Sequence, residues 1–256
     1  MRFRLGISIY CIPYLSIDSL LDFCEKNDFH SIELWDLPNT NGYKRLSRYL
    51  MQNNSELSVH IPLLDIGNVG AINDNIRELK DYLQRAGRWD AKRAILHTGV
   101  INTRERSQAI LAAEQVINSN LDTLEKNGII LCIENVGYLG GDLIHDFIQL
   151  AEFVDNFPKD LVCVAFDFAH ANITGGVQSG IEILGERIKE IHLSDNQGET
   201  EDHHKPIGTG KIDFETMNFR TIQDNITAIL EIASDNEWKT NLLDSRKALQ
   251  ELELIE

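Results

Sequence analysis

Eight short apolar runs, separated by longer amphipathic segments, constrain the fold of this 256-residue chain more than any other feature. The runs are rich in Ile, Leu and Val and show little alternation of apolar with polar residues. This pattern is typical of parallel strands that are covered on both faces. We therefore expect strands at residues 5–10, 31–35, 57–61, 93–98, 129–135, 162–168, 188–194 and 227–233.

A polar residue interrupts or ends seven of these runs. The seven are Glu33, His60, His97, Glu134, Asp167, His192 and Glu231, with separations of 27, 37, 37, 33, 25 and 39 residues. These separations are close to the length of one βα unit, which takes about 30 residues. Eight such units in about 250 residues predict an α/β fold, a single (β/α)8 TIM barrel, that occupies residues 1–256 as one domain. An open doubly wound sheet is the alternative, although the segment YCIPYLS after the first run lacks the glycine-rich turn of that fold.

Amphipathic patterns predict helices at residues 17–27, 109–128, 142–158 and 240–256. Loops are expected at 64–75, where Gly and Asn are frequent, and at 195–212. His145 falls inside one predicted helix and His30 near the end of another, so both are interpreted as surface residues.

Charge and cysteine usage limit the classes of function. The formal net charge is −16 and no dense Lys/Arg run occurs, which argues against general affinity for nucleic acid. None of the four cysteines forms a CxxC pair, so we expect reduced, buried thiols and a cytoplasmic location. The N-terminus lacks the features of a signal peptide, and no run reaches the ~18 apolar residues of a membrane helix.

In a barrel, the seven polar residues would lie close together in space. Parallel strands point the same way, so their C-terminal ends meet at one mouth, where the loops build the active site. A single histidine at a strand end is often only hydrogen-bonded, but seven ionisable groups together carry a large desolvation cost unless they are paired or bind metal. Imidazoles and carboxylates are the usual ligands of Zn²⁺, Mn²⁺, Fe²⁺ and Co²⁺. The sequence therefore predicts a divalent-metal site at the mouth.

Nearby polar residues extend this set. Asp167 precedes His170 by three residues, so the two side chains could share an ion. Asp195 follows His192 by three, and it either joins the site or orients a histidine. In an extended loop, side chains two apart point the same way, so Asp202 and His204 could face one ion while His203 points elsewhere.

The chain resembles the xylose-isomerase-like TIM-barrel superfamily. This superfamily contains sugar and sugar-phosphate isomerases and epimerases, and also the endonuclease IV type of apurinic-site (AP) nuclease, AP endonuclease family 2. The resembling motifs cover nearly the whole chain in order: GISIY, DFHSIELW, LSVHIP, AILHTG, LCIENV, VAFDFAHA, IKEIHLSDN, DHHKPIGTGKIDF and AILEI.

The resemblance implies two possible ligand sets. In isomerase and epimerase members, one ion is held by residues matching Glu134, Asp167, His192 and Glu231, and those matching Glu134 and Glu231 also act as acid and base. In the nuclease members, nine residues hold three zinc ions. Their matches here are all present: His60, His97, Glu134, Asp167, His170, His192, Asp202, His204 and Glu231. The cofactor expected is therefore one to three Zn or Mn ions.

Three functions are consistent with these residues. The favoured hypothesis is a metal-dependent isomerase or epimerase of a small sugar or sugar phosphate, with proton transfer through an enediolate that the metal stabilises. The alternative is a multinuclear zinc phosphodiesterase or AP endonuclease, against which the net charge counts if the substrate is duplex DNA. A non-catalytic binding barrel is disfavoured because neither acid/base carboxylate is missing.

Four further residues are candidates for substrate contact: Glu33, Trp35, His203 and Lys205. The Trp35 ring either stacks on a sugar or packs under a loop. Lys205 either holds a phosphate or carboxylate group or is a solvated loop lysine.

Overall fold

The computed structural model describes residues 2–9, 17–35, 43–100, 106–137, 142–198, 203–224, 226–233 and 237–255. Eight parallel strands form a closed barrel in sequence order. They are β1 (Arg4–Ser8), β2 (Ser31–Trp35), β3 (Glu56–His60), β4 (Arg93–Leu96), β5 (Ile130–Glu134), β6 (Val162–Asp167), β7 (Ile188–Leu193) and β8 (Thr227–Leu230). Because β1 pairs with β8, the sheet has no free edge, and the predicted TIM barrel is confirmed over the open sheet.

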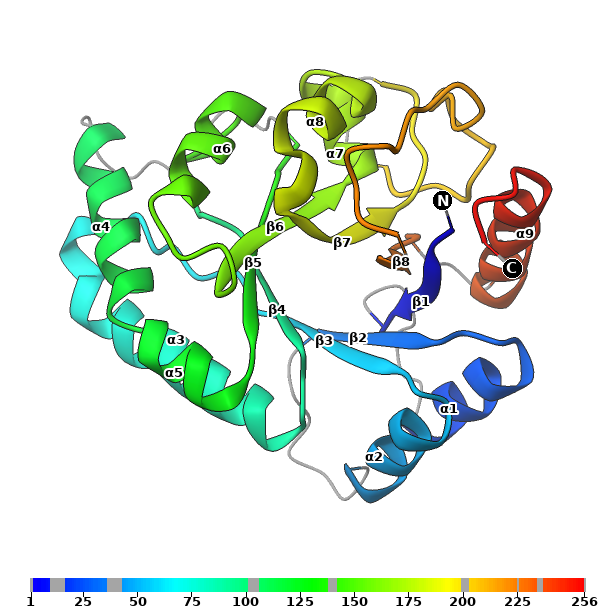
Figure 1. Ribbon diagram of the computed structural model, residues 1–256, viewed down its shortest axis with the longest axis horizontal. Helices are drawn as coiled ribbons and strands as arrows, with labels where there is room; N and C mark the ends of the chain where they lie inside the picture. The colour runs from blue at the N-terminus through cyan, green and yellow to red at the C-terminus, as the bar shows by residue number, and fades with distance from the viewer. Residues whose placement is uncertain are drawn as a thin grey trace.

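Helices surround these strands, as Figure 1 shows in a view in which the strands radiate from a common centre. They are α1 (Ile17–Lys26), α2 (Tyr43–Gln52), α3 (Ile72–Arg88), α4 (Arg106–Asn118), α5 (Leu121–Asn127), α6 (Phe147–Asp155), α7 (Phe168–Thr174), α8 (Val177–Leu184) and α9 (Trp238–Glu251), with short 3-10 turns η2 (Val69–Ala71) and η3 (Gly185–Arg187). The two ends of the chain lie side by side, since the Phe3 amide donates to the Leu254 carbonyl at 2.7 Å.

Two apolar clusters build the core. The large one lies between the strands and the helices. The small one consists of Ile95, Cys132, Cys163 and Ala165. Successive side chains of a strand point to opposite faces, so three of these residues share the barrel interior with the polar residue that follows two positions later. The small cluster therefore forms an apolar layer directly beneath the polar mouth.

The predicted helix at 109–128 is wrong in one respect, because the chain forms two helices there. The Asn120 side chain is fully buried and donates to the Val116 carbonyl at 2.9 Å and the Ile76 carbonyl at 3.3 Å. A side chain that binds nearby backbone competes with helix continuation, and α4 ends just before it.

Two other boundaries differ from the prediction. Helix α6 begins only at Phe147, because the Asp146 carboxylate accepts from the Gln149 amide at 2.8 Å and caps the helix. His145 therefore precedes the helix, where it is partly buried and contacts Arg106. The loop expected at 64–75 is shorter, since α3 starts at Ile72.

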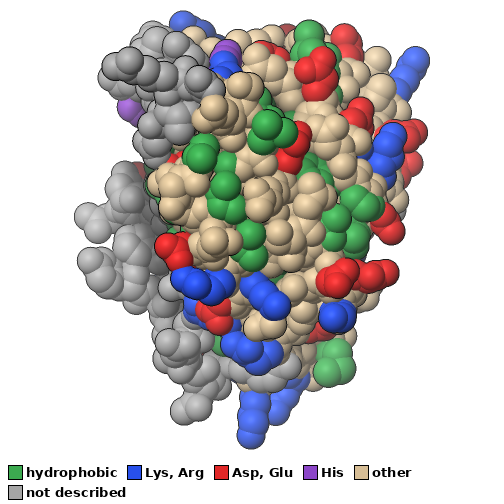
Figure 2. Space-filling view, turned by 90° about the vertical axis from the view of Figure 1, so that its left-hand side faces the viewer, with side chains coloured by type: hydrophobic (Ala, Val, Ile, Leu, Met, Phe, Trp, Pro, Cys, Tyr) green, Lys and Arg blue, Asp and Glu red, His purple; other side chains and the backbone are tan. Residues whose placement is uncertain are grey.

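The described surface is mixed in character. Figure 2 shows hydrophobic, acidic and basic side chains interspersed on the face that includes α3, α4 and α6. The three described cysteines, Cys24, Cys132 and Cys163, are free and buried as expected. Within the described ranges, no helix is both long and apolar enough to cross a membrane.

Candidate metal centre

Glu134, the last residue of β5, lies at the centre of the polar mouth. Its Oε2 atom is 3.1 Å from His60 Nε2 and 2.7 Å from His97 Nε2, while its Oε1 atom is 3.1 Å from His192 Nδ1. The three imidazoles come from β3, the end of β4, and β7. One buried carboxylate therefore joins side chains from widely separated parts of the sequence, as the convergence of parallel strand ends predicts.

Four groups of described side chains bring metal-ligating atoms within 4.8 Å of one another. We name them the β3–β4 set (His60, His97, Glu134), the central set (Glu134, Asp167, His192, Glu231), the loop set (Asp167, His170, His204) and the buried set (Glu33, Glu190, His192). The first three share Glu134 or Asp167. Of the nine residues implied by the nuclease resemblance, eight are brought together, and Asp202 lies outside the described residues.

Backbone carbonyls fix the orientation of three of the histidines. The Nδ1 atoms of His60, His170 and His204 lie 3.1, 2.9 and 2.9 Å from the carbonyl oxygens of Ile61, Asn135 and Glu231. A carbonyl can only accept, so each Nδ1 carries a proton and Nε2 is the ring nitrogen that remains to bind a metal. A donor bond from the second ring nitrogen is the usual arrangement of a metal-binding histidine.

His192 is fully buried among carboxylates. Its Nδ1 atom lies 2.8 Å from Glu231 Oε2 and 3.1 Å from Glu134 Oε1. Burial by itself would lower the pKa of His192, but Glu33, Glu134 and Glu231 outweigh it and raise that pKa well above its usual value. The carboxylates around His192 therefore favour a positive charge at this point, which either the protonated imidazole or a cation would supply.

The carboxylates of the central set respond in different directions. Burial opposes ionisation of Glu134, yet His192 and His97 hold its pKa well below the usual range. Burial also opposes ionisation of Glu231, but the neighbouring His192 outweighs it and lowers the pKa of Glu231 to about 2. Burial raises the pKa of Asp167, which the neighbouring His170 and His204 only partly offset. Glu134 and Glu231 thus favour the ionised form, and with Asp167 and His192 they form a donor set whose chemistry fits a divalent cation.

The loop after β7 carries His204 into this site. The chain turns back because both Asp195 oxygens accept backbone amides: those of Gly208, Gly210 and Ile212 at 3.0, 2.8 and 3.1 Å. A Cβ atom on Gly210 would lie only 2.1 Å from Asp195 Oδ1, so this close approach requires glycine. Asp195 therefore orders the loop rather than a histidine.

The two adjacent histidines of the loop have different environments. His204 is buried and belongs to the loop set, whereas His203 is exposed. Lys205 is half-buried, and its backbone pairs with that of Asp195 through bonds of 2.7 and 2.9 Å. The loop backbone thus turns one imidazole inward and the other outward.

The other two predicted substrate contacts, Glu33 and Trp35, both lie against histidines of the site. Glu33 is fully buried on the Nε2 side of His192, opposite Glu134 and Glu231, and its contact with substrate stays a prediction. The Trp35 ring stacks on the His60 imidazole, with centroids 4.1 Å apart and planes at 21°. One face of the indole is therefore occupied by a residue of the β3–β4 set.

Sequence reasoning missed two residues of the site. The Asn135 side chain donates to the Asp167 carbonyl at 2.9 Å and accepts from the Asp167 amide at 2.7 Å, which joins the ends of β5 and β6. Glu190 is fully buried and lies two residues before His192 on the same strand face. Side chains two residues apart on a strand point to the same face, so the spacing of Glu190 and His192 could have predicted a second acidic side chain inside the barrel.

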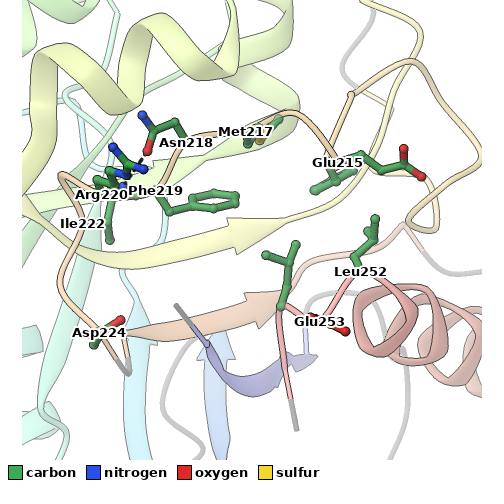
Figure 3. A pocket seen from close by; sticks show the side chains of 11 residues that line it. Glu215, Met217, Asn218, Phe219, Arg220, Ile222, Asp224, Leu252 and Glu253 are labelled. Carbon is green, nitrogen blue, oxygen red and sulfur yellow. Dashed lines mark hydrogen bonds between the residues drawn. The ribbon is translucent and has the colours of Figure 1, made fainter.

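A separate surface pocket of about 780 Å³ lies between residues 214–224 and the turn at 252–254. Figure 3 shows its lining, in which Glu215, Arg220 and Glu253 accompany apolar side chains. It contains no member of the four ligating sets, so the candidate site is the barrel mouth.

Comparison with known proteins gives a family match and several likenesses. A model of the family described as xylose isomerase-like TIM barrel matches residues 21–252. A probable endonuclease 4 of Staphylococcus epidermidis is 26% identical over 227 residues, which cover 80% of this chain and 75% of that protein.

Two solved structures are similar in fold. One is a D-tagatose 3-epimerase-like protein, with a TM-score of 0.83, 22% identity, and coverage of 98% of this chain and 97% of that chain. Another is IolI protein with a bound zinc atom, with a TM-score of 0.82, 16% identity, and coverage of 98% of both chains.

Proposed function

We infer the activity from the premise that this chain belongs to the xylose isomerase-like TIM-barrel family. We propose that it is a metal-dependent phosphoester hydrolase that holds more than one divalent ion at the barrel mouth. The net charge of −16 favours a small phosphoester over duplex DNA as substrate.

The loop set is the observation that carries this proposal. Proton transfer beside a carbonyl needs one ion, for which the central set suffices. The chain nevertheless places His170 and His204 against Asp167, and His60 and His97 against Glu134. Burying these additional ionisable groups is costly unless they are paired or bind cations, and cations would balance the carboxylates that several imidazoles share. Clustered ions are typical of phosphoester hydrolysis, and the relative named endonuclease 4 supports the same class.

The ligand chemistry favours zinc or manganese. Mixed imidazole and carboxylate sets suit these ions better than magnesium or calcium, which prefer oxygen ligands. The zinc atom in the fold neighbour IolI agrees with this choice. Ions held here would supply the positive charge and Lewis acidity that phosphoester hydrolysis requires.

The ligating residues of the mouth have different roles in this proposal. Glu134 and Asp167 each belong to two sets, so each would be a ligand shared between two sets if both held ions. The carbonyl bonds of His60, His170 and His204 hold the three rings in place and leave Nε2 as the nitrogen that would bind a metal. His97 is the most exposed of the ligating histidines, with 20% of its side chain accessible, and lies where substrate would approach.

Isomerase or epimerase activity on a small sugar is the second candidate. The supporting observation is that Glu134 and Glu231 both reach His192 Nδ1, so two carboxylates of the central set converge on one point. In that function, the pair would remove and return a proton on a substrate held between them. The strongly acidic net charge also suits a sugar better than a nucleic acid.

Metal content and a substrate panel distinguish the two candidates. The full chain is purified without chelators, its zinc and manganese per chain are measured by mass spectrometry, and it is assayed on a small phosphodiester, a duplex with one abasic site, and a panel of ketoses. Two or three tightly held ions with phosphodiester cleavage are expected. One exchangeable ion with ketose epimerisation and no cleavage would refute the hydrolase in favour of the epimerase.

A further inference from the structure

The buried set on the far side of His192 has a role that the metal ligands do not explain. Glu33 Oε2 lies 3.1 Å and Glu190 Oε1 3.7 Å from His192 Nε2. All three side chains are fully buried. Within the described part of the chain, Glu33 Oε2, Glu190 Oε1 and His192 Nε2 make no well-aligned hydrogen bond, either to another residue or to one another. Such atoms are costly to bury unless they satisfy one another.

The other oxygen of Glu190, Oε2, is bonded to Arg93, the first residue of β4, at the end of the barrel opposite the mouth. Arg93 Nε donates to Glu190 Oε2, and Arg93 Nη2 lies 3.0 Å from Thr227 Oγ1 and 2.8 Å from Glu56 Oε2. These partners come from β3, β4, β7 and β8. A line of charged side chains therefore runs from Glu56, at the start of β3, through Arg93 to Glu190, and it holds Glu190 by its Oε2 atom.

We propose that Glu33 and Glu190 are positioning residues that keep a proton on His192 Nε2, so that Nδ1 is the nitrogen presented to the metal. The inference rests on the proposed metal centre. Both nitrogens of His192 face carboxylates, so without the buried set the ring could flip or bind through either nitrogen. A carboxylate on the second nitrogen fixes the tautomer and makes the ligand more basic.

The same three residues could be suspected of enclosing an ion of their own. Arg93 already supplies the positive charge next to Glu190. Nδ1 of His192 faces the central set, so a second ion at Nε2 would require the ring to lose both protons. A single proton on Nε2 places a donor 3.1 Å from Glu33 Oε2 without that cost.

Three variants test the proposal. Glu33→Leu removes the acceptor while filling the space, Glu33→Gln keeps an acceptor oxygen without charge, and Glu56→Gln is the matched control. Glu56 belongs to the same line of charged side chains through Arg93, but it lies at the end of the barrel opposite the mouth. Zinc affinity is measured by competition with a chromophoric chelator. The His192 ring protons are followed by ¹H–¹⁵N NMR and assigned with His192→Gln.

We expect Glu33→Leu to weaken the tightest zinc site by about 10–100-fold and to abolish the Nε2–H resonance of His192. Glu33→Gln should keep that resonance and lose less than about tenfold in affinity, and Glu56→Gln should stay within about twofold of wild type. Wild-type affinity in Glu33→Leu, or an equal loss in Glu56→Gln, would overturn the proposal. So would the loss of one whole zinc equivalent with other affinities unchanged, which would indicate an ion in the buried set.

The two proposals fail in different ways. A wild-type protein that binds no metal would refute the multinuclear hydrolase. The Nε2–H resonance would still test the positioning role in that metal-free protein. Its presence in wild type and absence in Glu33→Leu would support the role, and its indifference to Glu33 would refute it.

Discussion

The substitution His204→Asn tests the loop set independently of the other sets, because His204 belongs to the loop set alone. The Nδ1 atom of His204 bonds the Glu231 carbonyl at 2.9 Å. The amide nitrogen of Asn can occupy nearly the same position and keep that bond, but Asn has no atom at the position of Nε2. The substitution therefore removes one ligand of the loop set with little change to the loop.

The size of the effect follows from the number of ligands. A structural zinc site with four ligands binds with about 10–16 kcal/mol, or about 2.5–4 kcal/mol per ligand. Losing one ligand should weaken the loop-set ion by about 60–900-fold. The central set shares only Asp167 with the loop set, so its ion should remain.

Metal content after dialysis against a weak chelator checks this expectation. His204→Asn should lose one zinc equivalent relative to wild type. His203→Asn is the matched control, because His203 is the neighbouring residue, is exposed, and belongs to none of the four sets. A full complement of ions in His204→Asn, or an equal loss in His203→Asn, would refute the assignment of the loop set.

Three other predictions follow from the same geometry. Glu134→Gln should lower activity by about 10²–10⁴-fold with an unchanged circular dichroism spectrum, because Glu134 belongs to two sets; an active variant would contradict its role. Zinc binding at pH 7 should release protons, since the pKa values of His60 and His192 are raised in the metal-free protein; titration calorimetry in buffers of different ionisation enthalpy measures the number, and affinity should weaken as the pH falls. Gly210→Ala should lower the free energy of unfolding by about 1–3 kcal/mol in urea titrations, because its Cβ would collide with Asp195, and an unchanged midpoint would refute that contact.

The sequence by itself determined the barrel and most of the candidate ligands. Both depend on local information: an apolar run becomes a buried parallel strand, and a polar residue at its end must lie at the mouth of a closed parallel barrel. Glu134 and His192 could therefore be assigned to the same space although 58 residues separate them. The TIM barrel was confirmed by the closure between β1 and β8.

The break before Asn120 shows where local pattern fails. The apolar periodicity continues through 109–128, but a buried side chain bonds backbone carbonyls of two helices and ends α4. One of those carbonyls belongs to a residue 44 positions away. A periodicity cannot reveal such a partner, since it depends on how the two helices pack.

Only the tertiary structure decided what each polar group faces. Glu33 and Glu134 have the same side chain, yet Glu33 is the middle residue of β2 and lies on the Nε2 side of His192, whereas Glu134 ends β5 and lies on the Nδ1 side. The pairing of Arg93 with Glu190 likewise joins β4 to β7 across the barrel. The sequence gives the residue type and predicts its position along a strand. The distances between side chains, which decide where a proton, a ligand atom or an ion can lie, depend on barrel closure, strand register and side-chain direction together.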